Sequence, residues 1–348
     1  MNKKLILLLL TCLLCLSSCS PNKKVISYTV YPIGFLIDRI SGNTIVNNSI
    51  QNDAIIQTAN LKENYKDIIS DSKYFFHIGK LEPYLKIELD EIKTLGSKIV
   101  DLSLHNAIYN FKRYSLVYFN DKESFIEDDY YDGEVFNDID YYDKDLYLWL
   151  DPSSMISMAK YVLETISLNN FENRDFYNSN YQKLKEQLID IDAGYQKLAN
   201  KLRKENKNIK FVSLSPSFGP WQKAYGFHIY PLILSKYGAI PTDEQLELII
   251  ERIKKDDVKY IVYEPNMNSE MLALFDKVEK ELKLTRINLS NLSSLTKSQL
   301  DDGKDYFSIM LENLAVLENI ATDVIKAKKD LEPIHDNKEE SGNESSTN

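Results

Sequence analysis

The sequence predicts an α/β protein with two parallel-sheet lobes joined by one long rigid helix, and with a ligand cleft between the lobes. Two observations lead to this class. In both halves of the chain, short runs rich in β-branched and aromatic residues alternate with helical segments, as in βαβ units. Between the halves, a single apolar seam with spacings of three and four residues indicates one long amphipathic helix.

The first half is expected to form the N-terminal lobe. Val25–Val30 predicts a strand, and Pro32–Ile40 predicts a helix that Gly42 ends. Further strands are expected at 44–50, 74–78, 98–102, 114–119 and 146–150, and further helices at 61–69, 83–95 and 152–166. Asp151, directly before Pro152, is expected to cap the last of these helices.

The second half repeats the alternation and is expected to form the C-terminal lobe. Strands are expected at 209–214, 260–263 and 284–289, and helices at 217–225, 242–255, 269–282 and 304–328. Thr242 and Gln245 are three residues apart, which predicts a capping box at the start of one helix.

The linking helix is predicted from its apolar seam. The seam consists of Tyr177, Tyr181, Leu184, Leu188, Ile191, Tyr195, Leu198 and Leu202. A dimeric coiled coil would give the same pattern. Gly194 is unusual in a long exposed coil, because glycine costs about 1 kcal/mol in a helix interior. We therefore expect a single helix along both lobes of a monomer.

The start of the chain predicts export. Lys3 and Lys4 precede an apolar run that ends at Leu16-Ser-Ser-Cys19. The run is too short for a membrane span and is typical of a secretory signal. Its end resembles a bacterial lipobox, in which Cys19 is acylated; an ordinary signal peptide that contains Cys is the alternative. The expected organisation is a signal peptide 1–18, a lipidated tether 19–25, an N-terminal lobe 26–170, a linking helix 171–206, a C-terminal lobe 207–329 and a disordered tail 330–348.

Composition excludes several functions. Cys12, Cys15 and Cys19 all lie at or before the expected cleavage site, which leaves no thiol for disulfides, thiolate catalysis, Cys-type zinc sites or iron–sulfur clusters. A net charge of −10 argues against nucleic acid. The chain has no glycine-rich phosphate loop and no Gly-x-Ser-x-Gly motif, so we expect no enzyme.

Several motifs indicate a family. They are Tyr31-Pro32, Asp145-Leu-Tyr-Leu-Trp-Leu-Asp-Pro152, Tyr225-Gly-Phe227, Pro241-Thr242, Tyr263-Glu-Pro265, and Tyr306 with Met310 and Asn313. Over roughly 26–325 the chain resembles the metal-binding solute-binding proteins of bacterial ABC importers, the zinc- and manganese-capturing lipoproteins. The resemblance implies two α/β lobes joined by one long helix, with the ligand held between them.

The family's metal ligands are expected to be substituted. Tyr147 stands where the family has His two residues before the tryptophan, and Ser215 stands where its second-lobe motif begins with His. The early His of the family falls at or near Gln57, and its late Asp near Ser290, with Asn288 and Asn291 as neighbouring options. Amide, phenol and hydroxyl groups are poor zinc ligands, because zinc prefers imidazole, thiolate and carboxylate. We therefore expect no high-affinity zinc or manganese site.

Other candidate ligands are few. His77 is expected in a packed strand, His105 in a loop, His228 at the start of a strand or helix, and His335 in the solvated tail. Together with Glu264, His105 and His228 are the fallback metal ligands near the cleft. Residues 121–145 contain eleven acidic and two basic side chains. A solvated acidic loop is expected there, with a weak calcium or manganese collector as the alternative.

These observations predict an extracytoplasmic solute-binding lipoprotein, anchored to the membrane by lipid on Cys19. It would deliver a small solute, or a weakly held divalent cation, to an ABC permease. Gln57, Tyr147, Ser215 and Ser290 are expected to line the cleft, with Glu264 nearby. The alternative is a surface-anchored adhesion protein that keeps the fold but not transport.

Overall fold

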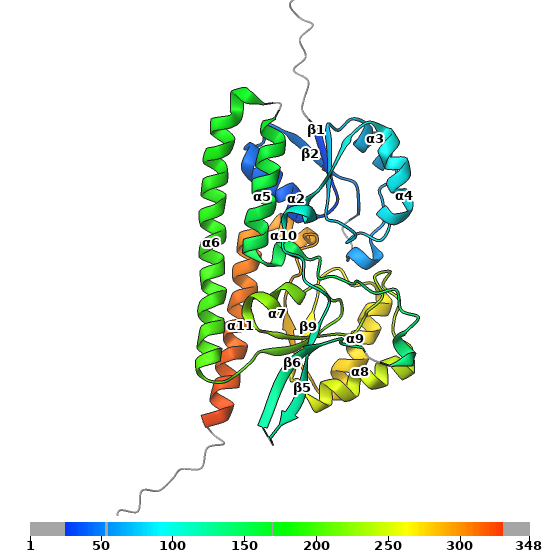
Figure 1. Cartoon of the computed structure of the whole chain (residues 1–348), viewed down its shortest axis with the longest axis vertical. Coiled ribbons are helices and arrows are strands. Elements are labelled where there is room, and N and C mark those ends of the chain that lie inside the picture. The colour runs from blue at the N-terminus through cyan, green and yellow to red at the C-terminus, as the bar shows by residue number, and fades with distance from the viewer. Residues whose placement is uncertain (1–24, 53–54, 121, 132, 169, 330–348) are drawn as a thin grey trace, which may run out of the picture.

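The computed structural model describes residues 25–52, 55–120, 122–131, 133–168 and 170–329. The expected signal peptide, Cys19, the tether up to residue 24, and the tail with His335 lie outside these residues. The elements form two parallel sheets, one above the other in Figure 1, with long helices along one side. Among the described residues, no helix combines the length and the apolar character needed to span a bilayer.

The N-terminal lobe is a parallel four-stranded sheet with strand order β2-β1-β3-β4. Its strands are β1 (Val25–Tyr28), β2 (Val46–Ser49), β3 (Tyr74–His77) and β4 (Lys98–Asp101), and its helices are α2 (Tyr31–Ser41), α3 (Tyr65–Ser70) and α4 (Leu85–Ile92). Gly42 ends α2 with a φ of 57°, a left-handed conformation that glycine adopts without strain. The predicted alternation is confirmed here.

The C-terminal lobe is a second parallel four-stranded sheet, with strand order β10-β9-β7-β8. Its strands are β7 (Lys210–Ser213), β8 (His228–Pro231), β9 (Tyr260–Tyr263) and β10 (Thr285–Asn288). Its helices are α7 (Gly219–Tyr225), α8 (Asp243–Lys255), α9 (Ser269–Leu282) and α10 (Lys297–Asp301). The capping box of Thr242 and Gln245 is present at α8. Strand β8 confirms the expectation that His228 begins an element.

One helix, α6 (Arg174–Lys204), runs along both lobes (Figure 1). All eight seam residues are buried. The helix packs against α2 and α5 (Pro152–Ser167) beside the N-terminal sheet, and against α7 and α11 (Tyr306–Lys329) beside the C-terminal sheet. A Cβ atom on Gly194 would lie 2.7 Å from Leu314 Cδ2, so the close approach of α6 to α11 explains this glycine.

Two of the segments predicted as strands of the parallel sheet do not belong to it. Residues 114–119 do not join the parallel sheet; β5 (Arg113–Phe119) forms an antiparallel hairpin with β6 (Lys122–Asp128). Residues 146–150 form no strand, and Leu148–Leu150 is a 3-10 turn that leads into α5. Local propensity favours a strand in both segments, but the first pairs with its nearest neighbour along the chain. The second is held by side-chain bonds from the C-terminal half, described below.

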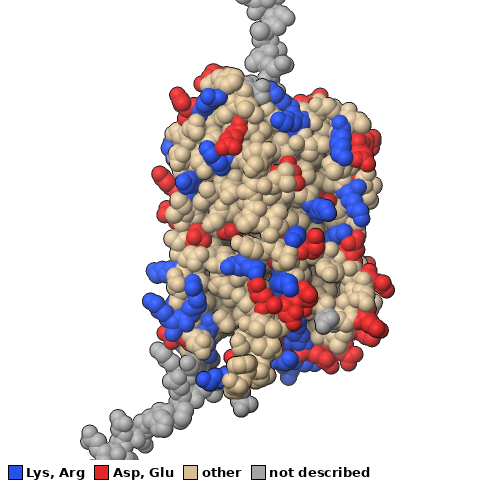
Figure 2. Space-filling model, viewed as in Figure 1, with Lys and Arg blue, Asp and Glu red and all other residues tan. Residues whose placement is uncertain are grey.

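The acidic segment is not simply a solvated loop, which corrects the expectation for 121–145. Its Tyr130 and Phe136 are 4% and 6% exposed and belong to the core of the C-terminal lobe. Glu127 pairs with Lys223, and Asp140 with Lys236. Figure 2 shows acidic side chains grouped beside basic ones in the lower half of the molecule. Aromatic burial and paired charges therefore attach this segment to the C-terminal lobe.

Candidate ligand site

The site lies where strands of the C-terminal sheet end. Ser215 and Ser217 follow β7, Glu264 follows β9 and Asn291 follows β10. In open parallel sheets, ligands bind beyond the carboxyl ends of the strands. Gln57, on the 3-10 turn Ile56–Thr58, approaches this edge from the N-terminal lobe. We call Gln57, Tyr147, Ser215, Ser217, Glu264 and Asn291 the interlobe cluster.

Glu264 is the centre of the interlobe cluster and is 0% exposed. Its Oε1 atom accepts hydrogen bonds from the backbone amides of Leu214 and Ser215, both at 3.0 Å. Its Oε2 atom accepts from Ser215 Oγ at 2.8 Å, Ser217 Oγ at 3.2 Å and Asn291 Nδ2 at 2.8 Å. Burial raises the pKa of this carboxyl, and the donors oppose the rise. Glu264 thus ties together the loops that follow three strands.

Tyr147 connects the two lobes. Its hydroxyl oxygen accepts a hydrogen bond from Gln57 Nε2 at 3.0 Å, and Ser215 also hydrogen-bonds to it. Burial raises the pKa of the phenol, and the charge of Glu264 raises it further. A phenol held protonated in this way cannot serve as an anionic metal ligand near neutral pH.

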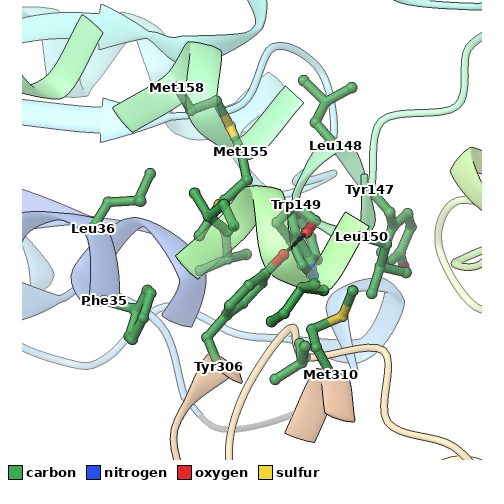
Figure 3. Packing of buried hydrophobic residues seen from close by; sticks show 14 of the residues in the cluster. Phe35, Leu36, Tyr147, Leu148, Trp149, Leu150, Met155, Met158, Tyr306 and Met310 are labelled. Atoms are coloured by element: carbon green, nitrogen blue, oxygen red, sulfur yellow. Dashed lines mark hydrogen bonds between the residues drawn. The ribbon is translucent and has the colours of Figure 1, made fainter. Parts of the chain in front are cut away.

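The segment around Trp149 is fixed from the C-terminal half of the chain. Trp149 Nε1 donates to the Asn291 carbonyl at 2.7 Å, and Trp221 Nε1 donates to the Leu150 carbonyl at 2.9 Å. Tyr306 Oη donates to the Trp149 carbonyl at 2.6 Å, the contact drawn between these residues in Figure 3. Asp151 then caps α5 by accepting from the Ser153 amide, as predicted. These bonds hold Tyr147 beside Ser215.

The structure brings four of the five predicted cleft residues together: Gln57, Tyr147, Ser215 and Glu264. Ser290 is buried nearby but engages other groups. Its amide donates to Asn313 Oδ1 and its carbonyl accepts from Asn313 Nδ2, both at 2.9 Å. Its hydroxyl accepts from the Leu292 amide. Asn291, one of the neighbouring options, is the residue that reaches Glu264.

The fallback histidines lie elsewhere. His105 is exposed and contacts the ring of Tyr161 on α5. His228 is buried between the rings of Tyr114 and Phe125. It begins β8, whereas Glu264 follows the end of β9, so the two residues lie at opposite ends of the strands of this parallel sheet. His77 is buried in β3 and stacks on Phe75, as expected. Of the three fallback ligands, only Glu264 belongs to the interlobe cluster.

Sequence reasoning missed three polar residues: Ser217, Asn291 as the partner of Glu264, and Glu82. Glu82 is 1% exposed and follows β3, and its carboxylate accepts a hydrogen bond from Thr29. An acidic residue shortly after an apolar strand was the available signal, because such positions lie at the ligand-binding edge of a parallel sheet.

Two parallel-sheet lobes, a long shared helix and a buried polar cluster between the lobes define a solute-binding protein with a rigid linking helix. Residues 26–320 match the family model described as ZnuA, zinc-uptake complex component A, periplasmic, and the chain belongs to this family. Members of this family are metal-binding components of ABC importers and are not enzymes.

The relatives agree with this assignment. The chain is 27% identical over 192 residues to the zinc-binding protein AdcA of Streptococcus pyogenes. This matched region covers 55% of this chain and 35% of that protein. The chain thus matches about a third of that relative's length. The structure titled periplasmic zinc binding protein TroA of Treponema pallidum aligns with a TM-score of 0.66 at 14% identity, over 87% of this chain and 99% of that one. The laminin-binding protein Lbp of Streptococcus pyogenes aligns with a TM-score of 0.61 at 19% identity, over 86% of this chain and 98% of that one.

The interlobe cluster contains one carboxylate, that of Glu264, and no imidazole or thiolate. In the described part of the chain, no group of three or more His, Cys, Asp or Glu side chains is placed to hold a metal ion. The carboxylate of Glu264 already accepts five hydrogen bonds from its own lobe. Ligating a metal would require breaking several of them, each at a cost of about 1.5–3 kcal/mol for a bond to a charged group.

Proposed function

We propose that this protein is an extracytoplasmic solute-binding lipoprotein of an ABC importer that lacks the family's high-affinity zinc or manganese site. The observation that carries the proposal is the interlobe cluster. Amide, phenol and hydroxyl groups from both lobes meet there, and the only carboxylate of the cluster is saturated by internal donors. The fold supports presentation of a solute to a permease, and the residues support a non-metal solute.

Zinc titration tests this proposal. The expected result is little change in melting temperature or calorimetric heat at micromolar zinc or manganese, because an occupied site at 100 times its Kd would add about 2.7 kcal/mol. The matched variant carries Gln57→His, Tyr147→His and Ser215→His together. It should gain zinc-dependent stabilisation, since imidazoles then approach from both lobes. A nanomolar Kd for zinc in the unaltered protein would contradict the proposal.

A surface-interaction role is the second candidate. It is supported by the β5–β6 hairpin, which projects from the lower lobe in Figure 1 and leaves Tyr118 and Phe119 64% and 72% exposed. Exposed aromatic groups at a projecting tip are suited to contacts with another macromolecule. One structural relative is titled as laminin-binding. Tyr118→Ser with Phe119→Ser should abolish adhesion to a laminin-coated surface if this role exists, and should leave solute binding intact.

A further inference from the structure

Four exposed apolar side chains lie at one end of the N-terminal lobe. Leu168 and Phe171, between α5 and α6, are 55% and 68% exposed, and Phe176, in the first turn of α6, is 47% exposed. Val46, the first residue of β2, is 41% exposed. We call these four residues the end patch. Exposed apolar side chains that gather at one end of a domain indicate a contact surface.

The end patch lies beside the residue where the N-terminal lobe begins. Val25 starts β1 and is the register partner of Val46. Two residues before Val46, the Thr44 hydroxyl is 2.8 Å from the hydroxyl of Tyr177, the residue after Phe176. Figure 1 accordingly shows the junction of α5 and α6 at the same end of the molecule as the start of β1. The chain that precedes β1 therefore enters the lobe at the end patch.

This end of the lobe faces away from the interlobe cluster. The strands of the N-terminal sheet are parallel, and their carboxyl ends point toward the C-terminal lobe (Figure 1). Val25 and Val46 begin their strands, so the end patch lies at the opposite, amino-terminal end. A surface bound to the end patch would leave the space between the lobes uncovered.

The expected lipid on Cys19 limits how far this end can lie from a bilayer. Six residue-to-residue steps separate Cys19 from Val25. A chain spans at most about 3.3–3.6 Å per residue, so this tether reaches no farther than about 20 Å in any conformation. A tether this short keeps the local concentration of the bilayer high, so that apolar contacts too weak for association in free solution become effective.

Resting on the proposed function, and in particular on its lipid anchor, we propose that the end patch docks on the bilayer that holds the anchor. Apolar side chains at a bilayer interface are stabilised because their surface leaves water. Arg174, whose guanidinium carbon is 4.8 Å from the centre of the Phe171 ring, can pair with a headgroup phosphate beside that ring. Docking directs α6 away from the membrane and holds the interlobe cluster above it, with the C-terminal lobe farthest out.

Quenching of a fluorescent label by lipids brominated in their acyl chains tests the proposal, because bromine quenches only at short range. The acylated mature protein should have no free thiol, so one introduced cysteine takes the label. Asn173→Cys places the label between Phe171 and Phe176. Lys122→Cys places it on the β5–β6 hairpin, at the other end of the molecule in Figure 1. In vesicles of phosphatidylcholine and phosphatidylglycerol, the label at 173 should lose about half its fluorescence or more, and the label at 122 should lose none.

Variants separate docking from tethering alone. Phe171→Ser with Phe176→Ser should reduce the quenching at residue 173 about twofold or more, because apolar contact with the bilayer is lost. The matched control is Ile87→Ser with Leu104→Ser, two exposed apolar residues of the same lobe outside the end patch, which should leave the quenching unchanged. Melting temperatures check that each variant is folded. If the double variant is less stable, Phe171→Ser alone repeats the test at the most exposed of the four residues.

Three results would each overturn this inference: no quenching at residue 173, equal quenching at residues 173 and 122, or equal losses in the patch variant and its control. Failure of the proposed function looks different. A mature protein that carries no lipid would not attach to the vesicles at all, and nanomolar zinc binding would contradict the proposed site while leaving the quenching result intact.

Discussion

At the scale of single residues, three buried ionisable groups show how surroundings set a role. Glu264 is saturated with donors and holds three loops, whereas one oxygen of Glu82 has no hydrogen-bond partner among the described residues. His228 is 3% exposed between two aromatic rings, and its Nδ1 atom has no hydrogen-bond partner in the part of the chain that the structure describes. The first group organises the site, the second has its pKa raised to about 8 by burial, and the third opposes protonation.

His228 predicts a pH dependence of stability. Burial, assisted by the charge of Lys210, lowers the pKa of His228 to about 3. Between pH about 6.5 and 3, the unfolded imidazole takes up a proton that the folded one does not, so the free energy of unfolding falls as pH falls. His228→Phe should flatten this dependence by about 1 kcal/mol per pH unit. Urea unfolding at several pH values measures it, with His105→Phe as the exposed control. An unchanged slope in His228→Phe would count against the assignment.

At the scale of elements, α6 is the part that both lobes share. Its seam packs on helices from each lobe, and the core is continuous from the N-terminal sheet through α6 to Trp221 and α11. Gly194, unusual by helix propensity alone, permits α11 to approach. The helix therefore derives its stability from tertiary packing, as expected for an amphipathic segment.

Leu188→Ala should lower the free energy of unfolding by about 2–5 kcal/mol, because a buried leucine is lost from the seam. Its neighbour Ile189 is 48% exposed, so Ile189→Ala should change stability by about 0.5 kcal/mol or less. Chemical denaturation compares the two. Equal losses, or a melting temperature that rises with protein concentration, would indicate that the seam serves a coiled-coil dimer.

At the scale of the whole molecule, the predicted lipid anchor on Cys19 would determine where the solute is captured. Cys19→Ala should release or mislocalise the protein, because lipid on this residue is the expected anchor. Cys15→Ala, within the apolar run of the signal, should remain membrane-bound. Fractionation with labelled palmitate separates the two variants. Palmitate incorporated into Cys19→Ala would refute the lipobox prediction.

The sequence by itself determined the architecture, because apolar periodicity and helix signals are local. The seam of α6, the capping box at Thr242 and the cap at Asp151 were all predictable from spacings of a few residues. Family motifs also indicated Tyr147, Ser215 and Glu264 as cleft residues, and Gln57 was predicted beside them without a strong local motif; the four lie together in the structure.

Tertiary structure alone decided the rest, because these outcomes depend on contacts between distant segments. The residues 114–119 pair with β6, and the turn at Leu148 is held by Trp221 and Tyr306. The acidic segment joins the C-terminal core through Tyr130, although its charge pattern predicts solvation. Asn291 rather than Ser290 reaches Glu264, and one oxygen of Glu82 has no partner within the described residues. Hydrogen-bond partners that are tens of residues apart produce no recognisable spacing pattern in a single sequence. Only the folded chain therefore shows which polar groups are paired with one another.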